Sequence, residues 1–262
     1  MLSPESAVAL NIGNFPLKFY SITMFLAILS GSILSCFIAK KYYKEINIEK
    51  FLDMLPIVVI SAILGARLYY VILDWGYYSN NLTEIFAIWN GGLSIHGGII
   101  GGFLSGYLYI KKHSLNLWKY ADIFTYGLVL GQIIGRLGNF FNIEAFGKPC
   151  SFSEILCLYV PLEKRPVGYT HFEFFHPTFL YEMTWNTFVL LVLFFGIRKF
   201  TKNIDGLIFF SYLILYSLGR FFIEGLRLDS ILTFGNFHIA QLVCVLIILL
   251  SVFMISILKL KD

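Results

Sequence analysis

Apolar residues are arranged along the chain in seven runs, which shorter polar segments separate. Each run is about as long as the 20 residues that an α-helix needs to cross the hydrocarbon core of a bilayer. The runs cover residues 19–38, 53–74, 92–110, 120–141, 176–196, 206–223 and 238–258. The pattern predicts an all-α membrane protein with seven transmembrane helices, forming a single polytopic membrane domain over residues 1–262.

Composition agrees with this prediction and excludes other classes of protein. Hydrophobic residues make up 58% of the chain and charged residues only 14%, whereas a soluble domain carries about 25% charged residues. The composition therefore excludes a soluble globular protein, a disordered chain and a nucleic-acid-binding protein. The net charge of +4 is too small to indicate a polyanionic partner.

The distribution of positive charge predicts the orientation of the helices. Most lysines and arginines outside the runs follow the first, third, fifth and seventh run: Lys40, Lys41, Lys44, Lys50, Lys111, Lys112, Lys119, Arg198, Lys199, Lys202, Lys259 and Lys261. Fewer lie on the other side: Lys18, Lys148, Lys164, Arg165 and Arg227. Because loops rich in lysine and arginine stay in the cytoplasm, we expect an exoplasmic N-terminus and a cytoplasmic C-terminus.

The longest connection, residues 142–175, falls on the exoplasmic side in this orientation. It is too long for a simple turn, so we expect a lid or a small exoplasmic cap at about 142–175. Cys150 and Cys157 lie in it and could form a disulfide if this side faces an oxidising compartment, or remain free thiols. The sequence has no spacing of cysteines and histidines that is typical of a metal site.

Three arginines lie within predicted spans, where each costs about 2.5–3.5 kcal/mol at the helix centre. Arg67, Arg136 and Arg220 each lie roughly 15 residues from the cytoplasmic end of a span, which is roughly 22 Å along the helix at 1.5 Å per residue. All three should therefore occupy the outer third of the membrane. Other polar residues reach the same level in the remaining spans or at their ends: Tyr20, His96, Glu144, Glu182 and Glu224.

These residues predict a polar chamber near the exoplasmic leaflet. The alternative is that each arginine extends to the headgroups or pairs with a carboxylate for stability alone, and for Arg67 the two interpretations are evenly matched. The glycines Gly97, Gly98, Gly101 and Gly102 form overlapping small-xxx-small patterns. Those patterns are more typical of close helix packing than of a phosphate loop.

Arginines in such a chamber favour a phosphate ligand, because the planar guanidinium matches two phosphate oxygens and stays charged when desolvated. A phospholipid headgroup can reach them from its own leaflet. His96 could accept a proton near neutral pH or serve as a structural hydrogen-bond donor. A transporter of anions or lipids is the alternative function, although the paired broken helices expected in matching halves are not found.

The segment Gly135–Gly147 reads GRLGNFFNIEAFG, and it resembles the signature of the bacterial prolipoprotein diacylglyceryl transferases. Shorter stretches extend the resemblance over almost the whole chain: Gly65–Tyr70, Ser94–Gly98, His176–Glu182, Tyr216–Arg227 and Gln241. Their order and spacing agree with the family. Residues 148–175 match no pattern of the family, and Ser21 follows Tyr20 where the family often has glycine.

The resemblance implies a multi-pass enzyme of the bacterial plasma membrane that uses no cofactor. It implies transfer of the sn-1,2-diacylglyceryl group from phosphatidylglycerol to the lipobox cysteine thiol of a prolipoprotein signal peptide. A thioether forms and glycerol phosphate leaves. This reaction would be the first step of lipoprotein maturation, with the lipid bilayer supplying the donor.

The expected roles follow from this chemistry. The catalytic residues would be His96, Arg136, Arg220 and Tyr20: His96 takes the thiol proton, directly or through Tyr20 or a water, and the arginines stabilise the leaving phosphate. Substrate binding would use Arg136, Asn139, Glu144, Gly147, Arg220, Glu224, Tyr216, Arg67 and Glu182.

Overall fold

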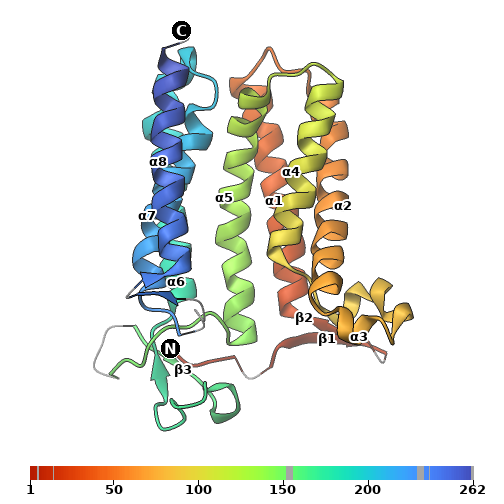
Figure 1. Ribbon diagram of the computed structural model, residues 1–262, viewed down its shortest axis with the longest axis vertical. Helices are drawn as coiled ribbons and strands as arrows, with labels where there is room; N and C mark the ends of the chain where they lie inside the picture. The colour runs from red at the N-terminus through yellow and green to blue at the C-terminus, as the bar shows by residue number, and fades with distance from the viewer. Residues whose placement is uncertain (5, 14, 152–155, 229–232, 236, 261–262) are drawn as a thin grey trace. The chain divides into compact units, whose positions relative to one another are not determined.

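The computed structural model describes residues 1–4, 6–13, 15–151, 156–228, 233–235 and 237–260, and most of them are helical (Figure 1). The long helices are α1 (Phe19–Tyr42), α2 (Ile48–Leu73), α4 (Ile95–Lys112), α5 (Leu117–Asn142), α6 (Thr178–Leu191), α7 (Leu207–Glu224) and α8 (Ile239–Lys259). A π-helical turn (Val192–Gly196) and a 3₁₀ segment (Ile197–Asn203) continue α6. Each predicted run overlaps one of these helices, and several of the helices extend beyond their run.

Among the described residues, five helices are long and apolar enough to cross a membrane: α1, α2, α6 with its continuation to Phe200, α7 and α8. The chain is therefore a multi-pass membrane protein. His96, Lys111 and Lys112 lower the mean hydropathy of α4, and Gln132, Arg136 and Asn139 lower that of α5. Seven spans and the orientation of the termini stay predictions. Lys261, which contributed to the charge count, lies outside the described residues.

The chain divides into two compact units, which we describe separately. The first unit contains residues 1–35 and 121–262, and the second contains residues 36–120. A single polytopic domain over residues 1–262 stays a prediction.

In the second unit, small residues bring α2 and α4 into close contact (Figure 1). A Cβ atom on Gly65 would lie 2.5 Å from the carbonyl oxygen of Gly97, and one on Gly101 would collide with the carbonyl oxygen of Ser61. These glycines are needed because larger residues would force the backbones apart. The structure thus confirms the helix-packing interpretation of this stretch.

The end of α2 leads into short elements that return the chain to α4. They are α3 (Trp75–Tyr78) and the 3₁₀ helices η1 (Leu82–Phe86) and η2 (Ile88–Asn90). The amide of Ser94, which precedes α4, donates to the carbonyl of Ala66 at 3.0 Å. The connection is therefore attached to α2 at both of its ends.

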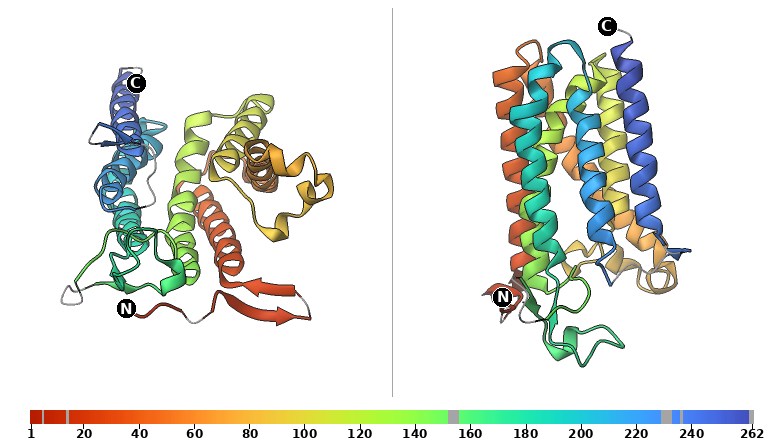
Figure 2. Two further views of the ribbon diagram at one scale, coloured as in Figure 1. Left: turned by 60° about the horizontal axis from the view of Figure 1, so that its bottom comes forward. Right: turned by 90° about the vertical axis from the view of Figure 1, so that its left-hand side faces the viewer.

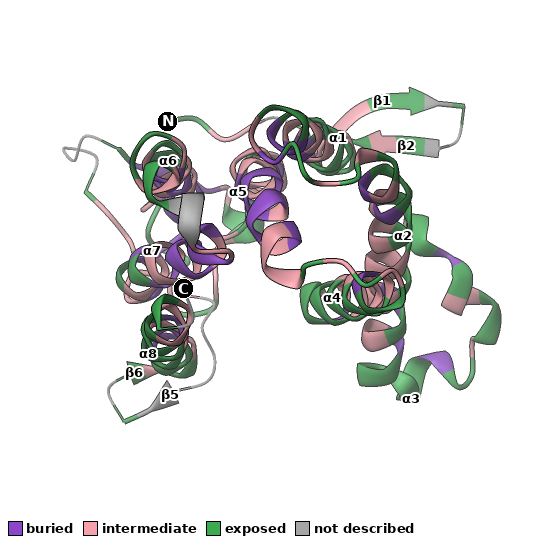
Figure 3. Ribbon diagram, turned by 90° about the horizontal axis from the view of Figure 1, so that it is seen from above, coloured by how far each residue is buried: buried purple, intermediate pink, exposed green. Residues whose placement is uncertain are grey.

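In the first unit, α5 packs against the first part of α1, and α6, α7 and α8 lie side by side (Figure 2). Gly31 and Gly127 allow the close approach of α1 and α5. The buried carboxylate of Asp122 on α5 accepts hydrogen bonds from the amides of Gly206 and Phe209, at 2.9 and 2.8 Å, and so caps the start of α7. Many side chains of α8 are exposed (Figure 3).

The described part of residues 142–175 forms a small folded cap around the strands β3 (Leu158–Tyr159) and β4 (Phe174–Phe175), which pair antiparallel. Its buried apolar residues, together with Phe179 of α6, are Phe146, Leu158, Val160 and Phe175. A disulfide joins Cys150 to Cys157. Residues 152–155 of the predicted cap lie outside the described residues. The cap also contains the 3₁₀ helix η3 (Leu162–Lys164).

Two further hairpins flank the helices of the first unit. Strands β1 (Val8–Ile12) and β2 (Phe15–Lys18) pair before α1. Strands β5 (Thr233–Phe234) and β6 (Phe237–His238) pair before α8. The all-α prediction is correct for the membrane helices and wrong for these short connections, where a tight antiparallel return satisfies backbone groups outside the helices.

Candidate active site

Glu182, in the second turn of α6, is the centre of a cluster of charges in the first unit. It is only 3% exposed. Its carboxylate forms ion pairs with Arg136 of α5, with Nη1 of Arg220 on α7 at 2.5 Å, and with Nη1 of Arg227 at 3.1 Å. The buried carboxylate of Glu182 on α6 is thus joined to α5 and to the end of α7, which are far apart in the sequence.

Glu224 is the second carboxylate of this cluster, and it is also 3% exposed. It lies one helical turn after Arg220 and accepts from Nη2 of that residue at 2.6 Å. The cluster therefore holds three guanidinium groups against two buried carboxylates, which leaves an excess of one positive charge. The side chains of Arg136 and Arg220 are 21% and 20% exposed, so neither arginine is fully enclosed.

Asn139 and Glu144 extend the cluster from Arg136 toward the surface. Nη1 of Arg136 donates to Oδ1 of Asn139 at 3.4 Å, and Nδ2 of Asn139 donates to Glu144 at 2.8 Å. Helix α5 ends at Asn142, and Ile143 and Ala145 have positive φ angles of 52° and 55°. This turn folds the chain back, so that the amide of Glu144 bonds to the carbonyl of Asn139.

Gly147 connects the cap to the segment that carries Arg227. Its amide donates to the carbonyl of His176 at 2.8 Å, and it forms an antiparallel bridge with Arg227. A Cβ atom at this position would lie 2.7 Å from the carbonyl oxygen of Leu226 and 2.8 Å from Cγ2 of Thr178. A side chain here would push Arg227 away from Glu182, so the requirement for glycine is steric.

Two residues before and within α8 hold the last turn of α7. The imidazole Nδ1 of His238 lies 3.1 Å from the carbonyl of Glu224, and Nε2 of Gln241 donates to the carbonyl of Phe221 at 3.1 Å. Gln241 also accepts from the amide of His238. These bonds fix the turn that carries Arg220 and Glu224.

Tyr20 and Tyr216 lie on the helices of the same unit. The ring of Tyr20 packs against Gly138, where an added Cβ atom would lie 2.8 Å from Cδ2. Tyr216 precedes Arg220 by one turn, with its ring 5.6 Å from that of Tyr212. Tyr212 in turn accepts from Gln132 of α5 at 2.8 Å.

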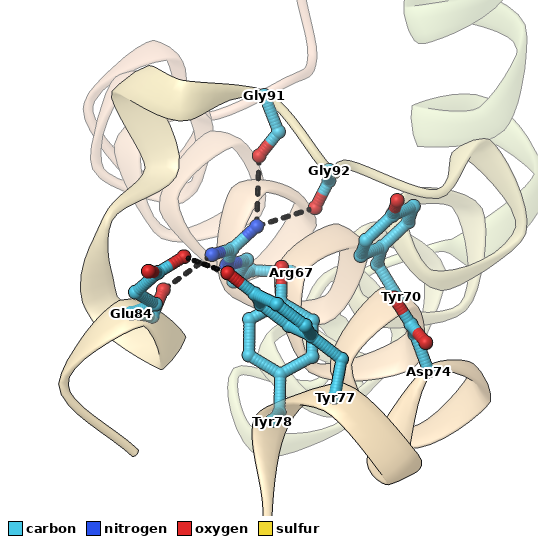
Figure 4. A pocket seen from close by; sticks show the side chains of 8 residues that line it. All are labelled: Arg67, Tyr70, Asp74, Tyr77, Tyr78, Glu84, Gly91 and Gly92. Carbon is cyan, nitrogen blue, oxygen red and sulfur yellow. Dashed lines mark hydrogen bonds between the residues drawn. The ribbon is translucent and has the colours of Figure 1, made fainter. Parts of the chain in front are cut away.

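His96 and Arg67 belong to the second unit, so their place in one chamber with Arg136 stays a prediction. His96 lies in the first turn of α4 and is exposed, with its ring 6.1 Å from that of Tyr69. Within the described part of the chain its imidazole has no hydrogen-bond partner. Arg67 lies in a pocket with Tyr70, Tyr77 and Tyr78 (Figure 4).

The structure therefore joins Arg136, Arg220, Glu182 and Glu224 directly, and Asn139 and Glu144 through hydrogen bonds. Arg227 was not among the predicted site residues, because it follows the apolar run and counts there as a loop charge. Its sequence signal is its place in the Tyr216–Arg227 stretch. Among the described residues, no group of three histidines, cysteines or carboxylates could hold a metal ion.

The fold and this cluster define a class of protein: a multi-pass membrane protein in which three arginines pair with two buried carboxylates. The family model for prolipoprotein diacylglyceryl transferase matches residues 7–257. The chain therefore belongs to the prolipoprotein diacylglyceryl transferase family.

Curated relatives agree with the family model. A phosphatidylglycerol–prolipoprotein diacylglyceryl transferase of Clostridium botulinum is 42% identical over 95% of this chain and 95% of its own length. One from Synechocystis is 42% identical over 93% of this chain and 86% of its own. One from Thermotoga petrophila is 45% identical over 92% of this chain and 80% of its own.

Proposed function

We propose that this protein transfers the sn-1,2-diacylglyceryl group of phosphatidylglycerol to the lipobox cysteine thiol of a prolipoprotein signal peptide. The thiol loses its proton, and its sulfur attacks the glycerol carbon that bears the phosphate. A C–S bond forms, the C–O bond to phosphate breaks, and glycerol phosphate leaves. The names of the curated relatives support the donor and the acceptor. The observation that carries the proposal is the cluster of arginines on Glu182.

Arg136 and Arg220 hold the phosphate in this proposal. Both side chains are partly exposed, and each guanidinium has N–H donors beyond those in its ion pairs that can reach phosphate oxygens, while Glu182 fixes the direction of both groups. As the C–O bond breaks, negative charge grows on the leaving oxygen, and the same fixed guanidinium groups stabilise it.

The other predicted binding residues act on or beside these arginines. Asn139 connects Arg136 to Glu144, and Glu224 orients Arg220. Gly147 holds the bridge that places Arg227 on Glu182. Tyr216 lies one turn before Arg220 on α7 and would contact the phosphate from the same helix.

His96 takes the proton of the substrate thiol. A free thiol has a pKa of about 8.5 and is mostly protonated at neutral pH, so a base accelerates attack. The exposed imidazole in the first turn of α4 supports this role, because its nitrogens are not used in helix packing. Tyr20 would relay the proton or hold the thiol near His96.

We also propose the membrane arrangement: seven spans in the bacterial plasma membrane, an exoplasmic N-terminus and an exoplasmic cap at 142–175. The disulfide between Cys150 and Cys157 supports this side for the cap. Disulfides persist in oxidising compartments and are rare in the cytoplasm.

The proposal is tested by incubating the purified protein with phosphatidylglycerol and a lipobox peptide. We expect equal amounts of glycerol phosphate and of peptide heavier by one diacylglyceryl group. A peptide with serine in place of cysteine should give neither product. Arg198→Lys is the matched control variant, because Arg198 donates to Phe194 at the far end of the α6 segment and should leave the rate unchanged. No glycerol phosphate from the wild-type protein would contradict the proposal.

A further inference from the structure

Arg67 is bound on several sides by backbone carbonyls of the segment between α2 and α4 (Figure 4). Nε donates to Ile85 at 2.8 Å, and Nη2 donates to Glu84 at 2.5 Å. Nη1 donates to Gly91 at 2.7 Å and to Gly92 at 2.9 Å. The residue is only 6% exposed, and its guanidinium carbon lies 5.1 Å from the centre of the Tyr78 ring.

These contacts leave little of Arg67 for a ligand. A guanidinium has five N–H donors, and the four bonds to carbonyls leave one N–H on Nη2. A phosphate is held by two parallel N–H donors on one edge of the guanidinium, and neither edge of Arg67 has two that are unused. This differs from Arg136 and Arg220, whose partners are carboxylates and which are partly exposed.

Glycines make this arrangement possible. Gly91 and Gly92 have φ angles of 92° and 70°, which point both carbonyls at the same nitrogen. A Cβ atom on Gly92 would lie 2.6 Å from Nη1 of Arg67 and 2.8 Å from the ring of Tyr70. Any side chain at residue 92 would therefore displace the arginine or the carbonyl that it binds.

The segment held by Arg67 leads directly into the turn that carries His96. Two residues after Gly92, the amide of Ser94 bonds to the carbonyl of Ala66, the residue before Arg67. Gly97 then contacts Gly65 of α2. The backbone on both sides of His96 is thus fixed to one stretch of α2.

We infer that Arg67 is a positioning residue that acts through His96: it clamps residues 84–92 to α2 and so fixes the imidazole for proton removal. This inference rests on the proposed function. A displaced base lowers turnover, whereas the binding of the phosphate by Arg136 and Arg220 is untouched. Arg67→Lys should therefore lower kcat by about 10–100-fold and leave the KM for phosphatidylglycerol unchanged. Lysine has a single ammonium, which cannot span carbonyls on opposite sides.

The decisive test is a double-mutant cycle with His96→Gln, because a merely structural defect would lower activity in either background. If Arg67 acts through His96, Arg67→Lys has little further effect on kcat once His96 is glutamine. Gly92→Ala is a second variant that loosens the clamp while Arg67 is kept, and it should behave in the same way. Full additivity of Arg67→Lys with His96→Gln would overturn the inference, and so would a tenfold rise in KM with kcat retained.

A second readout does not depend on activity. Hydrogen exchange of the amides of residues 84–94 should become faster in Arg67→Lys. Arg165→Lys is the matched control, since Arg165 also binds two carbonyls, those of Val160 and Thr170, and lies over a tyrosine ring. It should speed exchange near residues 160–170 only. Unchanged exchange in 84–94 would overturn the clamp, whereas a wild-type protein without transferase activity would contradict the proposed function instead.

Discussion

Glu182→Gln should break the cluster of charges, and its effect follows from the contacts of one side chain. Glutamine has nearly the same shape, but it is neutral and presents an N–H₂ donor where a carboxylate oxygen accepted. Three guanidinium groups would then face Glu224 alone, and the excess positive charge would rise from one to two.

The expected magnitude comes from the burial of these groups. Removal of one partner from a buried ion pair costs about 3–5 kcal/mol. Glu182 is 3% exposed, but its arginines are 12–21% exposed and partly screened by solvent. We therefore expect the lower end, a loss of about 3 kcal/mol in the free energy of unfolding. Turnover should fall by about 10²-fold or more, since the arginines lose their fixed direction.

The assay combines denaturant unfolding of the purified variant in detergent with the rate of glycerol phosphate release. Glu163→Gln is the control, because Glu163 is exposed in the cap and should change stability by less than about 0.5 kcal/mol. In the double variant Glu182→Gln/Arg227→Gln the excess charge returns to one, so part of the lost stability should return. Wild-type stability and turnover in Glu182→Gln would refute the reasoning. So would a double variant whose loss in the free energy of unfolding exceeds the sum of the losses in the two single variants.

Three further outcomes follow from the proposed site and topology. Arg136→Lys and Arg220→Lys should each lose about 10²–10³ in rate while the protein still inserts and folds, because lysine keeps the charge but loses the fork; near wild-type turnover in both would remove the phosphate role. Val167 is 98% exposed in the cap. A Val167→Cys variant in a cysteine-free background should therefore react with an impermeant thiol reagent added to intact cells. Labelling of cysteines placed at 111–119 instead would show that the predicted topology is inverted. His96→Gln should lose most activity at neutral pH and progressively less as the pH approaches the thiol pKa of about 8.5; a small loss that is uniform with pH would leave His96 a structural residue.

The long helices could be predicted from the sequence because their signal is local. An apolar run of sufficient length specifies a membrane helix with little reference to the rest of the chain. Small residues at helical spacing likewise indicated close helix packing at Gly97 and Gly101, and the structure shows that the partner is α2. The short hairpins and the cap have no such period, because their strands are two to five residues long.

The site was predictable in part. Arg136, Arg220, Glu182 and Glu224 could be grouped because helix geometry gives each a depth, and ion pairs join them as that depth suggests. Arg227 lies beyond α7, where depth along a helix no longer applies, and its position depends on the bridge to Gly147.

For Arg67, depth along the helix was known from the sequence but did not predict its partners. Its depth on α2 suggested a place beside the other arginines, but depth does not report which groups surround a side chain. Its partners are carbonyls of a loop, and they point inward only because of the positive φ angles at Gly91 and Gly92. No periodic pattern in the sequence encodes that conformation.

The central claim is that the arginines on Glu182 hold the phosphate of the lipid donor. A structure with phosphatidylglycerol bound tests it most directly. The account predicts phosphate oxygens about 2.7–2.9 Å from guanidinium nitrogens of both Arg136 and Arg220, with the carbonyl contacts of Arg67 unchanged. A phosphate bound elsewhere, with Arg136 and Arg220 contacting only Glu182 and Glu224, would contradict it.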